Sequence, residues 1–500
     1  MNSGQANDEE DGATFPTSDS RAKRPLVHYL YWSHFLSRWG DRMWEFAVGL
    51  LMITVWPDSL LLTAIYGLTE AASVAVFGVL VGNWVDRTPR LKVVQISLGL
   101  QNGSVIIAGL ALGFLLAHRT SLPGGLKTLA ALSVLVNVCG AISALAGLAT
   151  DIVVERDWVV VISQQQSPGL LTQLNSVMRR IDLSCKLVAP VFIGFLMSSV
   201  SSVACALSIA LWNLLSVGVE YKLLHSLYWS IPALQQGGPS RDLSLDSAAL
   251  ELVDLNLQNS FDEDIPLVDG EKNHSNSRGG IASRCLHLPY FQGWTDYFQQ
   301  EVMLAGVALA LLYFTVLSFG SLMTATLNWR GVPAYVLGLA RGVAAIVGIL
   351  ATIVYPILQP MLHTVRTGLW SICIQWSLLS IAATSTFIRS GSAASVMLIV
   401  GVAASRFGLW MFDLSVTQLM QDSIPEEKRG VVFGVQNSLQ SIMEMLSYVM
   451  AIIISDPKKF RIPVLMSYCS VGLAALLYAY YSYRVRGHLF HLDKLLRYLD

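Results

Sequence analysis

Four charged residues interrupt an apolar segment near the start of the chain. The stretch SRWGDRMWEFAV, residues 37–48, contains Arg38, Asp41, Arg42 and Glu45. Asp41 and Glu45 are four residues apart, so a helix would carry both carboxylates on one face. Carboxylates supply the hard oxygen ligands that many divalent cations prefer. The spacing therefore indicates a cation site, and the alternative is a purely structural network of charges.

The free-energy cost of placing these charges in a membrane favours a cation site over a purely structural network. A charged side chain at the centre of a membrane helix costs about 3 kcal/mol on insertion scales. Pairing of Arg38 with Asp41, or of Arg42 with Glu45, would offset part of that cost, but buried ion pairs seldom recover their full desolvation penalty. A water-lined passage that takes up a cation is a better reason to keep them. We therefore predict that Asp41 and Glu45 bind a metal ion.

Other polar residues in apolar segments extend this hypothesis. Asn213 and Glu220 are seven residues apart and share a helix face, and Gln101 lies in another apolar run. Amide and carboxylate oxygens together suit Ca²⁺. With Asp41 they form a second candidate cation site, although Asn213 could equally serve as a hydrogen-bonding contact between helices.

Composition indicates that these segments belong to a polytopic membrane protein. Of 500 residues, 53% are hydrophobic and 13% are charged, whereas soluble domains carry about 25% charged residues. The net charge is −1 and no long basic tract occurs, so we expect a lipid bilayer and no nucleic acid as partner.

The six cysteines lack C-x-x-C spacing, which favours reduced thiols. No nucleotide-binding loop or catalytic triad is recognisable, so we expect no enzyme.

Apolar runs predict an all-α integral membrane fold with about twelve spanning helices in two six-helix lobes. The expected spans are 28–55, 60–83, 92–117, 125–154, 171–199 and 203–226, followed by 300–325, 333–357, 366–387, 393–421, 429–455 and 461–484.

Segments of other composition flank the lobes. The polar residues between the lobes cannot bury enough apolar surface to fold. Aromatic residues at helical spacing in YFQGWTDYF indicate an amphipathic helix at the membrane interface or an aromatic belt before the next span. The expected organisation is a disordered cytosolic tail at 1–25, a lobe at 26–229, a disordered cytosolic linker at 230–286, the interfacial helix at 287–299, a second lobe at 300–485 and a cytosolic tail at 486–500.

The two lobes show weak internal similarity. QLNSVMRRID, residues 173–182, resembles GVQNSLQSIME, residues 434–444, and Asp151 matches Asp413 at the same offset. Such similarity predicts a parallel repeat. The symmetric place for a second metal site is then formed by the spans 300–325 and 429–455, where the candidate ligands are Ser321, Glu444 and Ser447.

The loop after the second span carries a motif typical of the major facilitator superfamily. GNWVDRTPRLK contains Gly82, Asp86, Arg87 and Arg90 at the spacing of that signature. Gly82 permits close helix approach, and Asp86 can cap a neighbouring helix, so that the contacts form and break between states. The alternative is a cluster of positive charges that only sets membrane orientation.

Further charges are expected on the same side of the membrane. They predict a network that closes the cytosolic mouth, or else solvated loop charges. The excess of Lys and Arg in these loops places both termini in the cytosol. The residues of this predicted network are Arg156, Asp157, Arg179, Arg180, Asp182 and Arg429.

Several stretches of the sequence belong together: WGDRMWEFAV, GNWVDRTPRLKVVQ, RRID, WNLLSVGVEY, GWTDYFQQEVMLAGVALALLYFTVLSF, GLWMFDLSVTQLMQ and RGVVFGVQNS. Together they resemble the ferroportin family, solute carrier family 40, and look more like plant than animal members. The resemblance covers nearly all of residues 25–485. It implies a major facilitator fold that exports ferrous iron, and related metals such as cobalt and nickel, from the cytosol by alternating access.

The resemblance also implies roles for single residues. Asp41 matches the family's metal-site aspartate, and Glu45 stands where animal members have His. Ser321 and Ser447 stand where animal members have the Cys and His of a second metal site. The residues Gln101, Asn213 and Glu220 match a calcium site that includes Asp41. Divalent metal is thus expected as substrate and Ca²⁺ as a ligand, with no permanently bound cofactor.

Two rival functions remain open at this point. A proton-coupled exporter of an organic solute would use Asp41 or Glu45 as a proton site, and a non-transporting membrane receptor would keep only the fold. Without a signal or transit peptide, we expect the plasma membrane or the vacuolar membrane. We expect the protein to be a monomer.

Overall fold

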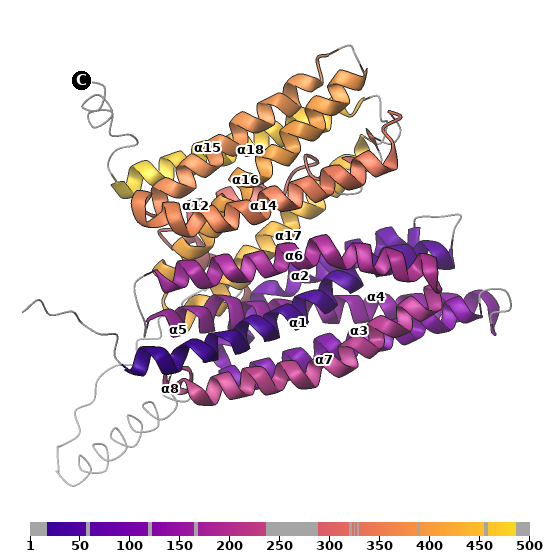
Figure 1. The fold of residues 1–500 in the computed structure, drawn as a ribbon, viewed down its shortest axis with the longest axis horizontal. Helices are drawn as coiled ribbons and strands as arrows, with labels where there is room; N and C mark the ends of the chain where they lie inside the picture. Colours follow the sequence, from indigo (N-terminus) through magenta and orange to yellow (C-terminus); the bar gives the residue numbers. More distant parts are fainter. Residues whose placement is uncertain are drawn as a thin grey trace, which may run out of the picture.

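The structure, a computed structural model, describes residues 18–56, 61–118, 123–164, 169–236, 289–319, 323–324, 326–327, 330–388, 391–454 and 459–486. The described residues form two helical bundles that lie side by side (Figure 1). The first contains α1 (Ser18–Val55), α2 (Leu61–Arg87), α3 (Arg90–Ala117), α4 (Gly125–Thr150), the π-helical segment η1 (Asp151–Trp158), α5 (Val159–Gln164), α6 (Leu170–Ser199), α7 (Ser202–Ser230) and α8 (Pro232–Gln236). The second contains α12 (Met303–Leu311), α14 (Ala334–Leu362), α15 (Thr364–Ser385), α16 (Gly391–Ser423), the 3₁₀ turn η2 (Glu426–Lys428), α17 (Arg429–Ile453) and α18 (Arg461–Arg486), and α11 (Pro289–Phe298) precedes it.

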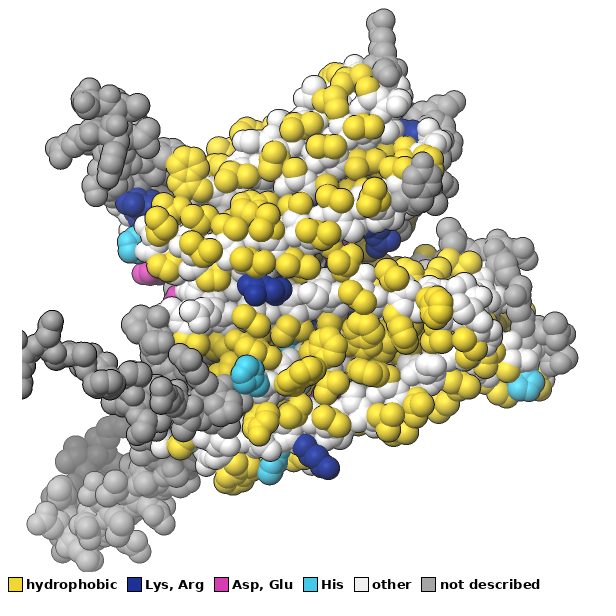
Figure 2. Space-filling model, viewed as in Figure 1, with side chains coloured by type: hydrophobic (Ala, Val, Ile, Leu, Met, Phe, Trp, Pro, Cys, Tyr) yellow, Lys and Arg dark blue, Asp and Glu magenta, His cyan; other side chains and the backbone are white. Residues whose placement is uncertain are grey.

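Within the described part of the chain, eight helices are long and apolar enough to cross a membrane. Apolar side chains cover most of the face of both lobes that Figure 2 presents, as expected for surfaces that meet lipid. Helix α1 has 38 residues and is long enough to span, since about 20 residues suffice, but its charges lower its hydropathy.

The flanking segments differ in part from expectation. Helix α1 already begins at Ser18, inside the segment expected to be a tail. Helices α7 and α8 extend to Gln236, inside the expected linker, because Leu234 is buried against the first lobe. The rest of the linker, residues 237–288, and the tails at 1–17 and 487–500 lie outside the described residues.

The fourth span contains a π-helical segment that its sequence does not reveal. Helix α4 ends at Thr150, and η1 continues without a break from Asp151 to Trp158. The wider turns of a π-helix change which side chains share a face, and such segments occur frequently at functional sites. Here Asp151 and Glu155 both turn toward α1, because both contact Arg38.

The seventh span is not the continuous helix expected over 300–325. Helix α12 ends at Leu311, and turns occupy residues 312–319. Neighbouring helices satisfy the freed backbone groups, as irregular backbone inside a membrane protein requires. Ser467 of α18 accepts a hydrogen bond from the Val316 N–H at 2.9 Å, and Arg406 of α16 donates to the Leu317 carbonyl. These partners come from distant sequence, so the interruption could not be predicted locally.

The two lobes touch closely where α2 crosses α17. Each helix has two glycines four residues apart at the crossing, Gly78 and Gly82 on α2 and Gly430 and Gly434 on α17. A Cβ added at Gly434 would lie 2.5 Å from the Gly78 carbonyl oxygen. Small residues allow helix backbones to approach in this way. We call the end of the lobes where α2 ends and α17 begins the gate end.

We predict that Gly434→Val separates α2 from α17 at the gate end. Overpacking of this kind costs about 1–3 kcal/mol, so hydrogen exchange at residues 429–436 should accelerate by about tenfold or more. Gly218→Val is the matched control, because a Cβ at Gly218 would meet nothing within 4 Å. Equal exchange in both variants would contradict the prediction.

Candidate metal site and gate

Asp41 is positioned by two helices. The Gln101 side chain of α3 donates a hydrogen bond to its carboxylate, with Nε2 2.7 Å from Oδ1. Arg38, one turn earlier on α1, lies 3.5 Å from the other carboxylate oxygen, and the Asp41 side chain is 27% exposed. The carboxylate is thus held in place but retains access to solvent.

Glu45 is more open. It pairs with Arg42 on the same helix, yet its side chain is 55% exposed. It lies close enough to Lys186 of α6 and Glu70 of α2 to interact with both charges. Glu45 therefore faces the space between helices α1, α2 and α6 and not the lipid. A carboxylate so exposed in a membrane helix requires water around it.

The candidate calcium residues lie near Asp41. Gln101 donates to it, Glu220 is close enough to interact with its charge, and the Asn213 side-chain oxygen lies beside Gly40. Glu220 of α7 is 1% exposed, and both its carboxylate oxygens lack a hydrogen bond of good geometry, as does the Gln101 Oε1 atom. Asn213 donates to the Ile209 carbonyl at 2.9 Å, which leaves its oxygen available. Buried polar groups are normally paired, so this arrangement of oxygens fits a bound cation.

The second lobe offers fewer ligands. Ser321 lies outside the described residues. Ser447 is 9% exposed and donates to the Glu444 carbonyl at 2.7 Å. Within the described residues, no group of three or more His, Cys, Asp or Glu side chains is placed to hold a metal ion. A site here therefore needs amide, hydroxyl or water ligands as well as carboxylates.

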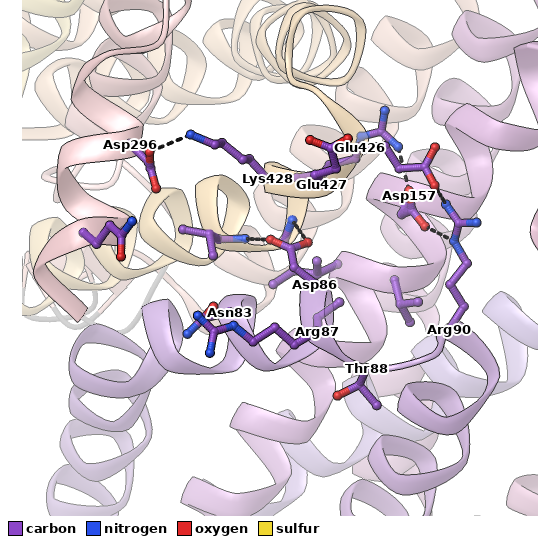
Figure 3. A pocket seen from close by; sticks show the side chains of 18 of the residues that line it. Asn83, Asp86, Arg87, Thr88, Arg90, Asp157, Asp296, Glu426, Glu427 and Lys428 are labelled. Atoms are coloured by element: carbon purple, nitrogen blue, oxygen red, sulfur yellow. Dashed lines mark hydrogen bonds and ion pairs between the residues drawn. The ribbon is translucent and has the colours of Figure 1, made fainter. Parts of the chain in front are cut away.

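Asp86 joins the lobes at the gate end. Its carboxylate accepts hydrogen bonds from the backbone N–H groups of Gly430 and Val431 at 2.6 and 2.7 Å (Figure 3). These N–H groups belong to the first turn of α17, where a helix has no partners of its own and favours negative charge. Asp86 therefore caps a helix of the opposite lobe.

A second carboxylate bridges the lobes beside Asp86. Asp157 accepts from Arg90 at 2.5 Å and from Arg429 at 2.6 Å, and Arg90 also pairs with Glu426 (Figure 3). These groups line a cavity of about 570 Å³. Arg87 makes no hydrogen bond or ion pair with the residues that the structure describes, and it extends toward Asn83 in Figure 3.

The remaining predicted gate residues lie deeper between the lobes. Arg179 pairs with Asp413 of the opposite lobe at 2.8 Å and lies 3.6 Å from Asp182. Arg180 donates to the Thr352 carbonyl of α14 at 3.3 Å. Arg156 lies over the Phe433 ring, 5.3 Å from its centre. Each of the three arginines contacts the second lobe.

Several charged residues of this region were not predicted as site residues. Arg38 pairs with Asp151 and, at 2.6 Å, with Glu155. The His34 Nδ1 atom lies 3.6 Å from Glu155. Arg38 was visible in the sequence as a charge within an apolar segment, and Asp151 as the match of Asp413 in the internal repeat, but neither feature indicated these ion pairs.

Helix α11 packs against both lobes at the gate end. Its Tyr297 is 1% exposed and donates to the Gln436 side chain of α17 at 2.6 Å, and burial raises the pKa of Tyr297. Asp296 pairs with Lys428 at 2.8 Å. A Cβ at Gly293 would meet Val79 of α2 and Val431 of α17. This helix, expected at 287–299, thus contacts the gate while its Phe291 and Phe298 are exposed.

We predict that Asp86→Ala opens the gate end. The substitution leaves two amide groups unpaired, at about 1–3 kcal/mol for each buried group, so hydrogen exchange at Gly430 and Val431 should rise about tenfold or more. Glu427→Ala, on the same cavity, is the control, because the structure gives Glu427 no ion pair with a described residue. Unchanged exchange in Asp86→Ala would show that the cap contributes nothing.

Comparisons with known proteins agree with this architecture. The family described as Ferroportin1 (FPN1) matches residues 24–471. Solute carrier family 40 member 1 of Oryza sativa subsp. japonica is 49% identical, over 94% of this chain and 94% of that protein. Its Arabidopsis thaliana namesake is 47% identical, over 95% and 90%. Ferroportin of Homo sapiens is 33% identical, over 92% and 91%.

Solved structures show the same fold. The crystal structure of a bacterial homologue of iron transporter ferroportin in the outward-facing state has a TM-score of 0.73 at 24% identity, covering 91% of this chain and 99% of that one. The inward-facing state of that homologue gives 0.59 at 24% identity, covering 92% and 98%.

These findings confirm three predictions: the family, its plant-like character and the all-α major facilitator fold. Solute carriers move solutes and are not enzymes, which agrees with the expected class. Since the family match covers most of the sequence, and relatives above 30% identity cover more than nine-tenths of it, the chain belongs to the ferroportin family, solute carrier family 40.

Proposed function

We propose that the protein exports a divalent metal, ferrous iron or a related ion such as cobalt or nickel, from the cytosol by alternating access. The observation that carries this proposal is the position of Asp41 and Glu45. They lie one turn apart on α1 with both side chains accessible, and Glu45 is more than half exposed. Relatives named Ferroportin, and a bacterial protein described as a homologue of iron transporter ferroportin, support the substrate class.

The contacts between the lobes support alternating access. The Asp86 cap, the Asp157 bridge and the Arg179–Asp413 ion pair all cross from one lobe to the other. To open the gate end, all three must break together, whereas their formation closes it. One chain supplies both lobes and all of these contacts, so we propose that a monomer suffices.

We propose that the gate end faces the cytosol. The gate loops carry the excess of Lys and Arg that marks cytosolic loops, including Arg87, Arg90, Lys428 and Arg429. Both termini then lie in the cytosol, and the membrane is the plasma membrane or the vacuolar membrane. Metal would enter while the gate is open and leave on the far side after it closes.

The chemical types of the candidate ligands influence which metal ions the protein transports. Glu45 adds a hard oxygen donor, and geometry and availability decide selectivity between divalent metals more than affinity does. In the second lobe, Glu444, Ser321 and Ser447 are the proposed oxygen donors. The Ser447 hydroxyl is bonded to its own helix, so we expect Glu444 to contribute most there.

Asp41 and the three residues beside it fit a resident Ca²⁺ ion. The oxygens of Glu220 and the Gln101 Oε1 atom, which lack a hydrogen bond of good geometry, and the side-chain oxygen of Asn213 are donor types that Ca²⁺ takes. When bound, the ion would supply positive charge to a buried carboxylate. The Gln101–Asp41 hydrogen bond itself joins α3 to α1 at this point.

We predict that Asp41→Ala lowers metal export into vesicles to background, because the site loses its better-positioned carboxylate. Radioactive iron, cobalt and nickel fluxes are measured in reconstituted protein, with Glu301→Ala as the control, an exposed acid outside the site. Full transport by Asp41→Ala would refute the assignment. Absence of metal flux in the unmodified protein would instead favour an organic-solute exporter or a receptor.

A second prediction concerns calcium. Ca²⁺ at about 100 times its Kd stabilises a folded protein by about 2.7 kcal/mol, so it should raise the melting temperature of the unmodified protein. Glu220→Gln should remove this increase and should be more stable than the unmodified protein in Ca²⁺-free buffer, because it neutralises a buried carboxylate that makes no ion pair with the described residues. Glu301→Gln serves as control, and an undiminished Ca²⁺ effect in Glu220→Gln would contradict the proposal.

A further inference from the structure

Ion pairs lead from the candidate metal site to the opposite lobe. Arg42 links Glu45 to Asp182, and Arg179 links Asp182 to Asp413. Arg38 forms a separate set of pairs around Asp41. Among the described residues, the two sets contain six carboxylates and three arginines. Each arginine is shared between acids of different elements. The members are Arg38, Arg42 and Arg179 with Asp41, Glu45, Asp151, Glu155, Asp182 and Asp413.

Arg38 is shared between the metal site and η1. Its guanidinium lies 3.5 Å from Asp41, whereas it lies 2.6 Å from Glu155 and also contacts Asp151. The looser contact is the one to the candidate metal ligand. A dipositive ion at Asp41 would therefore displace Arg38 from this carboxylate at low cost, because its stronger partners remain.

Arg42 is shared in the same way. It pairs with Glu45, and it donates twice to one oxygen of Asp182 on α6, from Nε at 3.0 Å and from Nη2 at 2.6 Å. Asp182 in turn lies 3.6 Å from Arg179. Two arginines thus interact with Asp182: Arg42 from the metal site and Arg179 from the interface between the lobes.

Arg179 completes the connection to the second lobe. It pairs with Asp413 of α16 at 2.8 Å, and its guanidinium lies over the Trp410 ring at 5.3 Å. Arg42, Arg179, Asp182 and Asp413 also line a cavity of about 170 Å³ between the lobes, which is large enough for several waters. The side chains therefore have room to exchange partners.

We propose that Arg38 and Arg42 are displaceable counter-ions of the metal site, and that the displacement of Arg42 by a divalent ion closes the gate through Asp182 and Arg179. A metal ion on Asp41 and Glu45 repels both arginines. Arg42 then binds Asp182 alone, and Asp182 attracts Arg179 less. Arg179 is left to Asp413, and the lobes are held together at the gate end. This proposal rests on the proposed metal transport.

The direction of this coupling suits an exporter. Metal that enters through an open gate end would strengthen the ion pair that closes that end behind it. A ligand shifts a conformational equilibrium only by its differential affinity for the two states. Here the difference arises because Arg179 can reach Asp413 only when the lobes are together.

The test uses full-length purified protein with Co²⁺ as probe. Binding is measured by calorimetry, and closure is measured by fluorescence energy transfer between labels at Lys222 and Arg484, exposed positions on different lobes. The variants are Arg42→Gln, which removes the competing cation, and Asp182→Asn, which breaks the connection. Arg341→Gln is the control, an exposed arginine of α14 outside the ion pairs.

The expected results separate coupling from a structural role. Co²⁺ should shift unmodified protein and Arg341→Gln toward closure. Arg42→Gln should bind Co²⁺ about tenfold more tightly, within the range typical of coupled sites, but should no longer close in response. A purely structural Arg42 predicts weaker binding. Asp182→Asn should bind Co²⁺ and should already favour closure before Co²⁺ is added, because Arg179 then has only Asp413 as its partner, so Co²⁺ should cause no further shift.

Three outcomes would overturn the proposal. One is a Co²⁺-induced shift toward closure in Asp182→Asn as large as in unmodified protein, and another is weaker Co²⁺ binding by Arg42→Gln. The third is loss of Co²⁺ binding in Asp182→Asn, because Asp182 would then act at the metal site itself. Unmodified protein that binds none of Fe²⁺, Co²⁺ and Ni²⁺ would contradict the proposed function, and the coupling with it.

Discussion

The central interaction in this structure is the sharing of arginines between carboxylates of different helices inside the membrane. Ionic side chains are costly at this depth, and a buried pair of them rarely stabilises a fold better than apolar packing would. Yet α1, η1, α6 and α16 meet through such pairs, in which Arg38, Arg42 and Arg179 each contact more than one acid. This arrangement is poorly suited to stability alone. It suits a protein whose charges must change partners.

The acids of α1 do pair with the arginines of the same helix, so local neutralisation accounts for part of their presence. It does not account for all of it. Glu45 stays more than half exposed, and Asp41 keeps access to solvent although Gln101 and Arg38 both contact it. Glycine contacts between α2 and α17 bring the lobes together at one end, and the Asp86 cap reinforces the crossing. The site and the gate therefore belong to one interface, and a movement of one lobe affects both.

Much of this organisation was predictable from sequence. Apolar runs of spanning length predict two lobes, and the spacing of Gly82 and Asp86 predicts a contact with a neighbouring helix. The four-residue spacing of Asp41 and Glu45 places them on one face whatever surrounds them. Two features were not predictable, the π-helical turn at Asp151–Trp158 and the end of α12 at Leu311. Both depend on side chains of other helices, such as Arg38, Ser467 and Arg406, whose proximity exists only in the folded protein.

The proposed mechanism depends most on metal reaching the carboxylates of the first helix. The anomalous scattering of cobalt in crystals of the full chain tests this directly. If metal binds there, a cobalt peak will lie within about 2.0–2.6 Å of an oxygen of Asp41 or Glu45, the range of metal–oxygen ligand distances. A protein that transports cobalt but shows its only peaks away from α1 would contradict the proposed mechanism.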